Sequence, residues 1–305
     1  MNEIWHILGA GSLGGLWAAR LFRAGVPLRI ILRNPVRLAD YRAAGGLGLL
    51  ENGLLRVYPV PAELPDADSP ISRLLVACKA YDAEAAIAEV AQRLTKGAEI
   101  LLLQNGLGSQ QAIAQRWPDS RCVYISSTEG AYRQVGFQIV HAGLGQNWLG
   151  GPSHRVSPPW LADLGAAGIP YAWTDNIMSK LWRKLAINCA INPLSVLHDC
   201  RNGELLAHPE QLHQLCEELS ELLQACVQGD AADGLEAEVL SIIEATAGNY
   251  SSMNQDVRNG RRTEVSYLLG EACRTARQHN LELPGLSALL KRLQAFLHHR
   301  GLPAD

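Results

Sequence analysis

A glycine-rich turn near the start of the chain constrains the fold more than any other feature. The turn Gly9-x-Gly11-x-x-Gly14 follows an apolar run and precedes a helical pattern. In a dinucleotide-binding turn the first glycine permits the bend, the second lets the backbone approach a pyrophosphate, and the third lets the helix pack against the strand. The alternative is an ordinary tight turn, but strand, turn, helix and second strand all follow within about 30 residues. The residues expected to bind a dinucleotide are Gly9, Ala10, Gly11, Ser12, Leu13 and Gly14.

Short apolar runs and helical patterns alternate up to about Trp173. Strands that are apolar almost throughout are typical of a parallel sheet buried on both faces. The expected strands are Ile4–Leu8, Leu28–Leu32, Leu74–Cys78, Ile100–Leu103 and Cys122–Ser126. The helical patterns between them are Gly14–Ala24, Asp82–Leu94 and Ser109–Trp117. This alternation predicts an α/β domain with a doubly wound, Rossmann-type sheet over residues 1–174.

Two further pairs of extended segments interrupt this alternation. Gly46–Leu50 and Leu54–Val60 flank the dipeptide Asn52-Gly53, which between apolar runs is a strong hairpin signal. Gly136–His141 and Gln146–Leu149 form a second extended pair. We therefore expect a hairpin at the first pair and two more strands at the second.

The pattern becomes helical from residue 175 onward, with few strand signals. Apolar residues recur there at the spacing of amphipathic helices. The expected helices are Ile177–Ile191, Gln211–Gln228, Glu236–Gly248, Thr263–His279 and Leu286–His299. This pattern predicts a second, all-α domain over residues 175–305.

Composition excludes several classes of function. The formal net charge of −3 offers no basic stripe for nucleic acid, and no apolar run approaches the ~20 residues of a membrane span. The N-terminus has no basic region followed by a cleavable apolar segment. Seven cysteines without a C-x-x-C pair indicate free, mostly buried thiols in a reducing compartment. We expect a cytoplasmic protein with a small-molecule partner, as a monomer or a homodimer.

The end of the second expected strand bears on the choice of cofactor. An NAD-specific site usually has an acidic residue there, which binds the ribose 2′-hydroxyl. This chain has Arg33 instead, followed by Arg37. A guanidinium suits a 2′-phosphate because it offers paired N–H donors. The sequence therefore favours NADP(H), with a solvated surface arginine as the alternative.

Two polar residues follow other expected strands. Lys79 comes after Leu74–Cys78, and Asn105 comes after Ile100–Leu103. In open α/β sheets ligands bind outside the carboxyl ends of the strands. We expect Lys79 to meet phosphate or ribose oxygens, and Asn105 to reach ribose, nicotinamide or substrate with its donor and acceptor. A solvated loop lysine and a plain Asn-Gly turn are the alternatives.

The first expected helix of the second domain carries a row of polar residues. Lys184, Asn188 and Asn192 recur every four positions and so lie along one helix face. Polar groups on a largely buried helix need hydrogen-bond partners, which an oxygen-rich substrate would supply. A solvated polar stripe is the alternative interpretation.

Two polar stretches further along have a structural and a functional interpretation. Asn249, Ser251 and Ser252 precede a short helical pattern, so they either cap that helix or offer an amide–hydroxyl cluster to a carboxylate. Glu264 lies near the start of the expected helix Thr263–His279. It serves either the helix dipole or, if Lys184 is close in space, the chemistry of that lysine.

Together these residues resemble the ketopantoate reductase (2-dehydropantoate 2-reductase) family over nearly the whole chain. The N-terminal marks are the glycine turn, Lys79 and the segment Gln104–Gly108. The C-terminal marks are more specific: Leu181–Asn188, Asn192–Leu194, Asn202–Leu205, Ser251–Met253, Gln255–Arg258 and Thr263-Glu264. Several ordered motifs at matching separations carry the resemblance.

The resemblance implies a cytosolic enzyme of the pantothenate route to coenzyme A, which reduces ketopantoate to (R)-pantoate with NADPH. Lys184 matches the family's proton donor, and Glu264 matches an acid near that lysine and the cofactor. Asn105 matches a residue that touches both ligands. The residues matching substrate contacts are Asn188, Asn192, Asn202, Asn249, Ser251 and Ser252. Ala131 matches a cofactor contact, although the stretch Thr128–Ala131 follows the family pattern loosely.

Three points stay open. A related β-hydroxyacid-type dehydrogenase for another 2-oxo acid is one alternative, and a non-catalytic NADP(H)-binding sensor is another. A carboxylate beside a cofactor phosphate is unfavourable, so Glu129 is expected to point away from it. The basic cluster Arg258, Arg261 and Arg262 has no assigned role beyond a solvated surface.

Overall fold

The chain forms two compact units. The computed structural model describes residues 3–151, 156–226 and 228–305. The first unit comprises Met1–Gln104 and Ser109–Ile177, and the second comprises Asn105–Gly108 and Met178–Asp305. The division therefore falls a few residues beyond the expected one. It also places the short segment 105–108 with the helical unit.

A mostly parallel sheet of eight strands forms the centre of the first unit. Its order is β12-β11-β8-β7-β6-β1-β2-β5. The strands are β1 (Trp5–Leu8), β2 (Leu28–Ile31), β5 (Ala62–Glu63), β6 (Ile71–Val76), β7 (Leu94–Leu102), β8 (Arg121–Ser127), β11 (Asn147–Gly150) and β12 (Tyr171–Trp173). β11 runs antiparallel to β8, and the other neighbours pair in parallel. All five strands expected for this sheet are confirmed.

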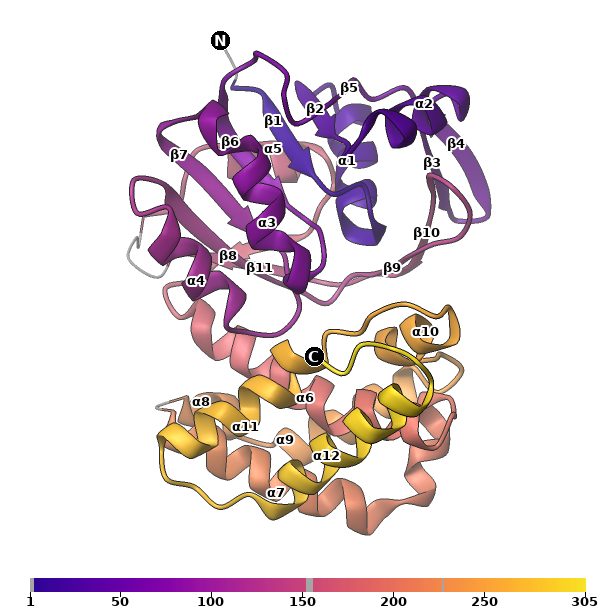
Figure 1. Cartoon of the computed structure of the whole chain (residues 1–305), viewed down its shortest axis with the longest axis vertical. Helices are drawn as coiled ribbons and strands as arrows, with labels where there is room; N and C mark the ends of the chain where they lie inside the picture. The colour runs from indigo at the N-terminus through magenta and orange to yellow at the C-terminus, as the bar shows by residue number, and fades with distance from the viewer. Residues whose placement is uncertain (1–2, 152–155, 227) are drawn as a thin grey trace. The chain divides into compact units, whose positions relative to one another are not determined.

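Helices cover both faces of this sheet, as a doubly wound fold requires (Figure 1). The helices of the unit are α1 (Ser12–Arg23), α2 (Pro35–Ala43), α3 (Ala80–Val90), α4 (Ser109–Arg116) and α5 (Leu161–Ala166), with a 3-10 turn at Ala91–Arg93. α1 and α5 share one core with the sheet, in which Trp5, Trp17 and Trp160 are almost fully buried. α3 packs beside α4. The predicted fold class is confirmed.

A second, smaller sheet packs on α1. Its order is β4-β3-β10-β9, with β4 (Leu54–Tyr58), β3 (Leu47–Glu51), β10 (Gln138–Gly143) and β9 (Gly130–Arg133). The expected hairpin is confirmed as β3 and β4, and Asn52 and Gly53 both have positive φ, as its tight turn requires. The other expected pair is wrong as a pair: β10 joins β3 and β9, whereas β11 joins the large sheet.

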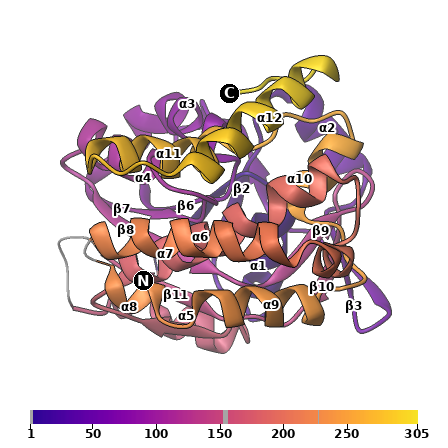
Figure 2. The ribbon, with the colours of Figure 1, turned by 90° about the horizontal axis from the view of Figure 1, so that it is seen from below.

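Every regular element assigned in the described part of the second unit is helical, which confirms an all-α domain. The helices are α6 (Ile177–Leu197), α7 (Pro209–Ala225), α8 (Gly229–Ala232), α9 (Leu235–Ala245), α10 (Ser252–Arg258), α11 (Leu269–Gln278) and α12 (Pro284–His299), with 3-10 turns at Asn202–Ala207 and Val265–Tyr267. α7 lies centrally and contacts α9, α11 and α12 (Figure 2). Residue 227, near the expected end of the helix at 211–228, lies outside the described residues.

The largest differences from the expected helix boundaries lie at the end of α6 and the start of α11. α6 continues through Pro193 to Leu197. Proline costs the helix one backbone hydrogen bond, but the burial of Leu194 and Val196 beyond it offsets this loss. Thr263 and Glu264 do not begin a long helix, since α11 starts only at Leu269. Leu268, at φ −108° and ψ −95°, interrupts the helical backbone between the 3-10 turn and α11.

The cysteines fit the expectation from composition. All seven cysteines are free, and five are buried; Cys78 and Cys226 are partly exposed. Burial raises the pKa of the Cys122 thiol to about 11 and that of Cys216 to about 12, so these thiols are unreactive at neutral pH. In the part of the chain that the structure describes, no helix is both long and apolar enough to cross a membrane.

Candidate functional site

The glycine turn has the geometry that its sequence predicts. Gly9 has φ 106°, and a Cβ there would lie 2.7 Å from the backbone nitrogen of Cys78. A Cβ on Gly14 would collide with the carbonyl oxygen of Gly9. At Gly11, by contrast, the nearest atom to an added Cβ is 3.8 Å away. The backbone is therefore tight where strand and helix meet and open in the middle of the turn.

The N-terminus of α1 leaves backbone donors for a ligand. Gly11 is the N-cap and forms no side-chain capping hydrogen bond. The first backbone bond of the helix runs from Gly15 N to Gly11 O, at 2.9 Å. The amides of Ser12, Leu13 and Gly14 precede this bond, and such amides at a helix N-terminus bind phosphate. The turn fits the pyrophosphate of a dinucleotide.

The other expected cofactor residues of the first unit occupy different environments. Arg33 follows β2, is exposed, and forms no ion pair with any described residue. Arg37 is engaged instead: it lies 3.5 Å from Asp40 and stacks on the ring of Phe137. Arg33 is thus the arginine with its donors available. Lys79 is the half-buried N-cap of α3, and Ala131 in β9 packs against the cluster on α1.

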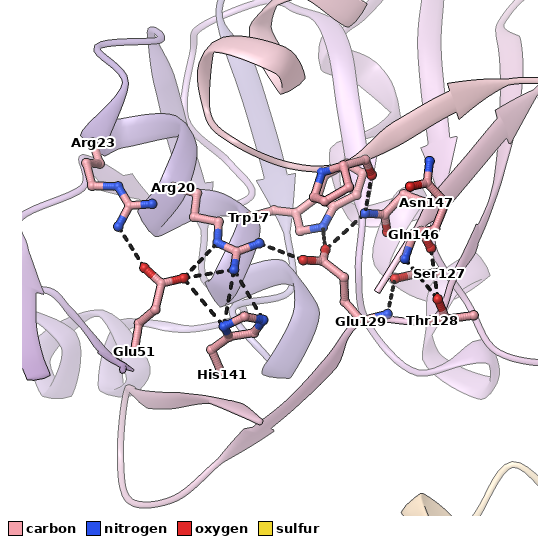
Figure 3. Close-up of polar contacts among 11 residues, drawn as sticks. Trp17, Arg20, Arg23, Glu51, Ser127, Thr128, Glu129, His141, Gln146 and Asn147 are labelled. Carbon is pink, nitrogen blue, oxygen red and sulfur yellow. Dashed lines mark hydrogen bonds and ion pairs between the residues drawn. The ribbon is translucent and has the colours of Figure 1, made fainter. Parts of the chain in front are cut away.

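Glu129 belongs to a buried polar cluster rather than to an open site (Figure 3). Its carboxylate accepts hydrogen bonds from Arg20 at 2.6 Å, Trp17 at 3.0 Å and Asn147 at 3.0 Å. Arg20 also donates to Glu51 at 2.8 Å. These five residues hold α1 to β3, β11 and the segment before β9, and the carboxylate of Glu129 is fully engaged by donors of the protein.

Lys184, Asn105 and Glu264 meet within the second unit. The Lys184 ammonium donates to Asn105 Oδ1 at 2.7 Å, and Asn105 Nδ2 lies 3.5 Å from Glu264 Oε2. Asn105 reaches this unit because Leu107 N donates to Tyr267 O at 2.9 Å. A Cβ on Gly106 would collide with the same carbonyl oxygen. The expected proximity of Glu264 to Lys184 is therefore present, with Asn105 as the bridge.

The environment of Lys184 changes its acidity. Burial lowers the pKa of the Lys184 ammonium to about 8, and the negative charge of Glu264 opposes the decrease. An amine with a pKa near the working pH is suited to proton transfer, because both of its protonation states are accessible. Perturbed groups of this kind gather at functional sites.

The two asparagines that follow Lys184 on α6 have free side chains. Asn188 is half-buried, and Asn192 is only 5% exposed. Neither side-chain amide forms a hydrogen bond with a described residue, and neither has a fully buried atom without a partner, so both remain accessible. The pair therefore offers donors and acceptors to a ligand.

Asn202 and Asn249 are linked through the backbone. Asn202 N donates to Asn249 O at 2.9 Å, and its Nδ2 donates to Thr246 Oγ1 at 2.9 Å. Asn202 is only 7% exposed, and its Oδ1 is buried without a partner among the described residues. Asn249 is exposed. Asn202 thus anchors the segment that carries Asn249.

The neighbouring serines differ sharply. Ser251 is buried and caps α10 by accepting from Asn254 N at 3.1 Å. Ser252, the next residue, is exposed, and its side chain makes no hydrogen bond to a described residue. Ser251 therefore fits the capping interpretation of this stretch, and Ser252 fits the ligand-binding interpretation.

The three arginines without an assigned role do not form one patch. Arg258 binds Asp199 at 2.8 Å, Arg261 binds Asp256 at 3.4 Å, and Arg262 binds Asp305 at 3.1 Å. Each charge is thus balanced locally. Arg258 also stacks on the Tyr250 ring and donates to Asn254 Oδ1 at 2.9 Å, so it supports the segment that precedes α10.

Sequence reasoning missed Ser195 and Asn254, which lie beside the expected site residues. Asn254 is 1% exposed and donates to the carbonyl oxygen of Ser195. Ser195 is fully buried, and its hydroxyl lies 2.6 Å from that of Ser251. No spacing rule connects residues this far apart, and only the proximity of Asn254 to the cap Ser251 hinted at a role.

Comparisons with known proteins identify the family. Residues 5–153 match the family model described as Ketopantoate reductase PanE/ApbA, and residues 176–297 match its C-terminal model. The chain is 33% identical over 291 residues to the 2-dehydropantoate 2-reductase of Shigella flexneri, covering 94% of this chain and 93% of the relative. The chain belongs to the ketopantoate reductase family. Within that family it is an enzyme, an oxidoreductase.

Solved structures share the fold at lower identity. A PanE/ApbA family ketopantoate reductase from Ralstonia eutropha JMP134 is 24% identical with a TM-score of 0.88, and covers 98% of this chain and 100% of that one. D-mandelate dehydrogenase, solved with NADH and anilino(oxo)acetate, is 20% identical with the same TM-score, covering 99% and 100%. At these identities the likeness supports the fold alone.

Proposed function

We propose that this enzyme reduces ketopantoate (2-dehydropantoate) to pantoate with NADPH, and that Lys184 donates the proton. The single observation that carries the proposal is the bridged set Lys184–Asn105–Glu264, in which an amine with a pKa of about 8 is linked to a carboxylate through the Asn105 amide. The named relatives, 33% identical over nearly the full length, supply the substrate.

The chain's own residues account for the proton and the charge. A bound reduced nicotinamide supplies the hydride, which adds to the C2 carbonyl carbon of the substrate. Negative charge then develops on the carbonyl oxygen, and a protonated Lys184 stabilises it and transfers a proton from Nζ. General acid catalysis of this kind contributes ~10²–10⁴-fold to the rate. The carboxylate of Glu264 keeps the lysine protonated at neutral pH, because its charge opposes the fall in pKa.

The free polar side chains of the second unit orient the substrate. Asn188 and Asn192 offer amides on the face of α6 that carries Lys184, and Ser252 and Asn249 offer an exposed hydroxyl and amide. Fixing the substrate in this way makes the transfer effectively unimolecular. Ser251 and Asn202, also expected as substrate ligands, act in this proposal by holding the segment 249–252 in place.

The first unit supports NADPH over NADH. The amides at the start of α1 bind the pyrophosphate, and Arg33, which has no ion-pair partner among the described residues, binds the 2′-phosphate. Lys79 and Ala131 complete the proposed set of cofactor contacts. A guanidinium matches a phosphate with two parallel hydrogen bonds, whereas the 2′-hydroxyl of NADH offers it no such pairing.

A panel of 2-oxo acids tests the proposal. We expect NADPH oxidation to show its highest kcat/KM with ketopantoate, above pyruvate, 2-oxoisovalerate and phenylglyoxylate. Higher efficiency with phenylglyoxylate would favour a mandelate-type dehydrogenase, whose fold this chain shares. Binding of NADPH without turnover of any 2-oxo acid would instead indicate a sensor.

A further inference from the structure

A chain of hydroxyl groups connects α6 to the start of α10. Ser195 Oγ lies 2.8 Å from the carbonyl oxygen of Asn192 and 2.6 Å from Ser251 Oγ. Ser251 Oγ in turn accepts from Asn254 N at 3.1 Å. Ser195 and Ser251 are 0% and 5% exposed. We call Asn192 O, Ser195, Ser251 and Asn254 N the serine relay.

The groups at the two ends of the serine relay, Asn192 O and Asn254 N, determine the direction of every hydrogen bond in it. A carbonyl oxygen only accepts, so the single hydroxyl proton of Ser195 goes to Asn192 O. Ser251 must then donate its proton to Ser195. A backbone amide only donates, so Asn254 N–H donates to Ser251. The proton of Ser251 is therefore used within the protein and is not available to a substrate oxygen.

A second contact reinforces the same connection. Asn254 donates from Nδ2 to the carbonyl oxygen of Ser195 and accepts from Arg258 Nε at 2.9 Å. Asn254 is 1% exposed. Buried hydrogen bonds with all members satisfied fix a geometry, because each alternative arrangement leaves a polar group unpaired. The relay therefore sets the distance between Asn192 on α6 and Ser252 on α10.

We propose that Ser195 and Ser251 are positioning residues for the 2-oxo acid. The relay holds Ser252 close to Asn192 on α6, so that the hydroxyl of Ser252, and not that of Ser251, binds the substrate. The proposal rests on the proposed function. This proposal gives Ser195 a role in substrate affinity, although its buried hydroxyl already donates its proton to Asn192 O. Loss of the Ser195 hydroxyl should weaken substrate binding more than it slows proton transfer from Lys184.

The main test compares two buried serines on α6. Ser195→Ala breaks the relay, whereas Ser179→Ala removes a hydroxyl of similar burial that bonds Asp230 at 2.8 Å. We expect Ser195→Ala to raise the KM for ketopantoate about tenfold, the effect of one lost hydrogen bond, with kcat within about threefold and an unchanged Kd for NADPH. Ser179→Ala should keep the wild-type KM. An unchanged KM in Ser195→Ala, or an equal rise in both variants, would overturn the proposal.

A double-mutant cycle separates positioning from direct contact. Ser251→Thr keeps a hydroxyl and a good cap, so its KM should stay near that of the wild type, whereas Ser251→Ala should raise it. The double variant Ser195→Ala/Ser251→Ala should match Ser251→Ala alone, because both changes interrupt one relay. Multiplied effects on KM would mean that Ser251 binds substrate itself.

The wild-type chain distinguishes the two proposals. If it reduces no 2-oxo acid, the proposed function is wrong, and the role of the relay in substrate binding falls with it. If it reduces ketopantoate while Ser195→Ala retains the wild-type KM, the function stands and only the relay is contradicted.

Discussion

Two polar regions of this molecule differ in how their groups are satisfied. In the first unit, Arg20 binds both Glu51 and Glu129, and Trp17 and Asn147 donate to the other oxygen of Glu129. In the second unit, the side chains of Asn188, Asn192 and Ser252 form no hydrogen bond with a described residue. A polar cluster that satisfies itself supports the fold, whereas one left open awaits a ligand.

The same contrast separates the two acids that sequence reasoning placed near the ligands. Glu129 is sealed, with a side chain 0% exposed and an ion pair to Arg20. Glu264 shares Asn105 with Lys184 and raises the pKa of that lysine against the effect of burial. Substitutions should therefore affect stability in the first region and activity in the second.

The largest effect on activity is expected from Lys184→Ala. It removes the proton donor, so kcat should fall by at least ~10²-fold, while the Kd for NADPH stays unchanged. Because burial lowers the pKa of this ammonium, its charge does not stabilise the folded state, and the thermal midpoint should hold. Steady-state kinetics and fluorescence titration of NADPH check both parts. Near-normal turnover would contradict the assigned role.

The largest effect on stability is expected from Glu129→Ala. It leaves the Arg20 guanidinium buried with one of its two carboxylate partners missing, and breaking a buried pair costs about 3–5 kcal/mol. Urea denaturation measures the loss in the free energy of unfolding. Glu129→Gln, which keeps an acceptor, is the matched control and should lose less. If the folded Glu129→Ala enzyme lost kcat as Lys184→Ala does, the two regions would not differ as described.

Arg33→Ala removes a charged group of the first unit that has no ion-pair partner among the described residues. Hydrogen bonds to charged groups contribute about 1.5–3 kcal/mol, so the KM for NADPH should rise about 10–100-fold while that for NADH changes little. Arg37→Ala is the control, because Arg37 is held by Asp40 and Phe137. Equal efficiency of the wild-type enzyme with both cofactors would refute the NADPH assignment.

Asn192→Ala should give the smallest and most diagnostic effect. The side-chain amide of Asn192 forms no hydrogen bond with a described residue, so its removal should change the free energy of unfolding by less than about 1 kcal/mol. The KM for ketopantoate should nevertheless rise about tenfold. Kinetics and denaturation on the same sample decide the matter. A large loss of stability with an unchanged KM would place Asn192 in the structural class with Glu129.

Local patterns were enough to predict much of the fold. The apolar runs identified the strands of the large sheet, Asn52-Gly53 identified the hairpin, and the four-residue spacing of Lys184, Asn188 and Asn192 placed them along one helix. Each of these features depends on residues close in sequence, where steric and hydrogen-bonding preferences act directly.

Contacts between distant residues were not predictable from local patterns, and the proximity of Lys184 and Glu264 was expected only through the family resemblance. Asn105 follows a strand of the first unit, yet it packs with the second because its neighbour Leu107 bonds Tyr267. The three arginines that look like one patch each bind a different acid. The pairing of Ser195 with Ser251 spans 56 positions. No periodicity carries such information, since it arises only when helices pack.

The most direct test of the central claim is the pH dependence of kcat/KM for ketopantoate reduction, measured from about pH 6 to about pH 10. Burial lowers the pKa of Lys184 to about 8, so the lysine loses its proton as the pH rises through that value. The account predicts that kcat/KM falls above pH 8, in step with the loss of the proton donor. A profile that stays flat to about pH 10 would contradict Lys184 as the acid.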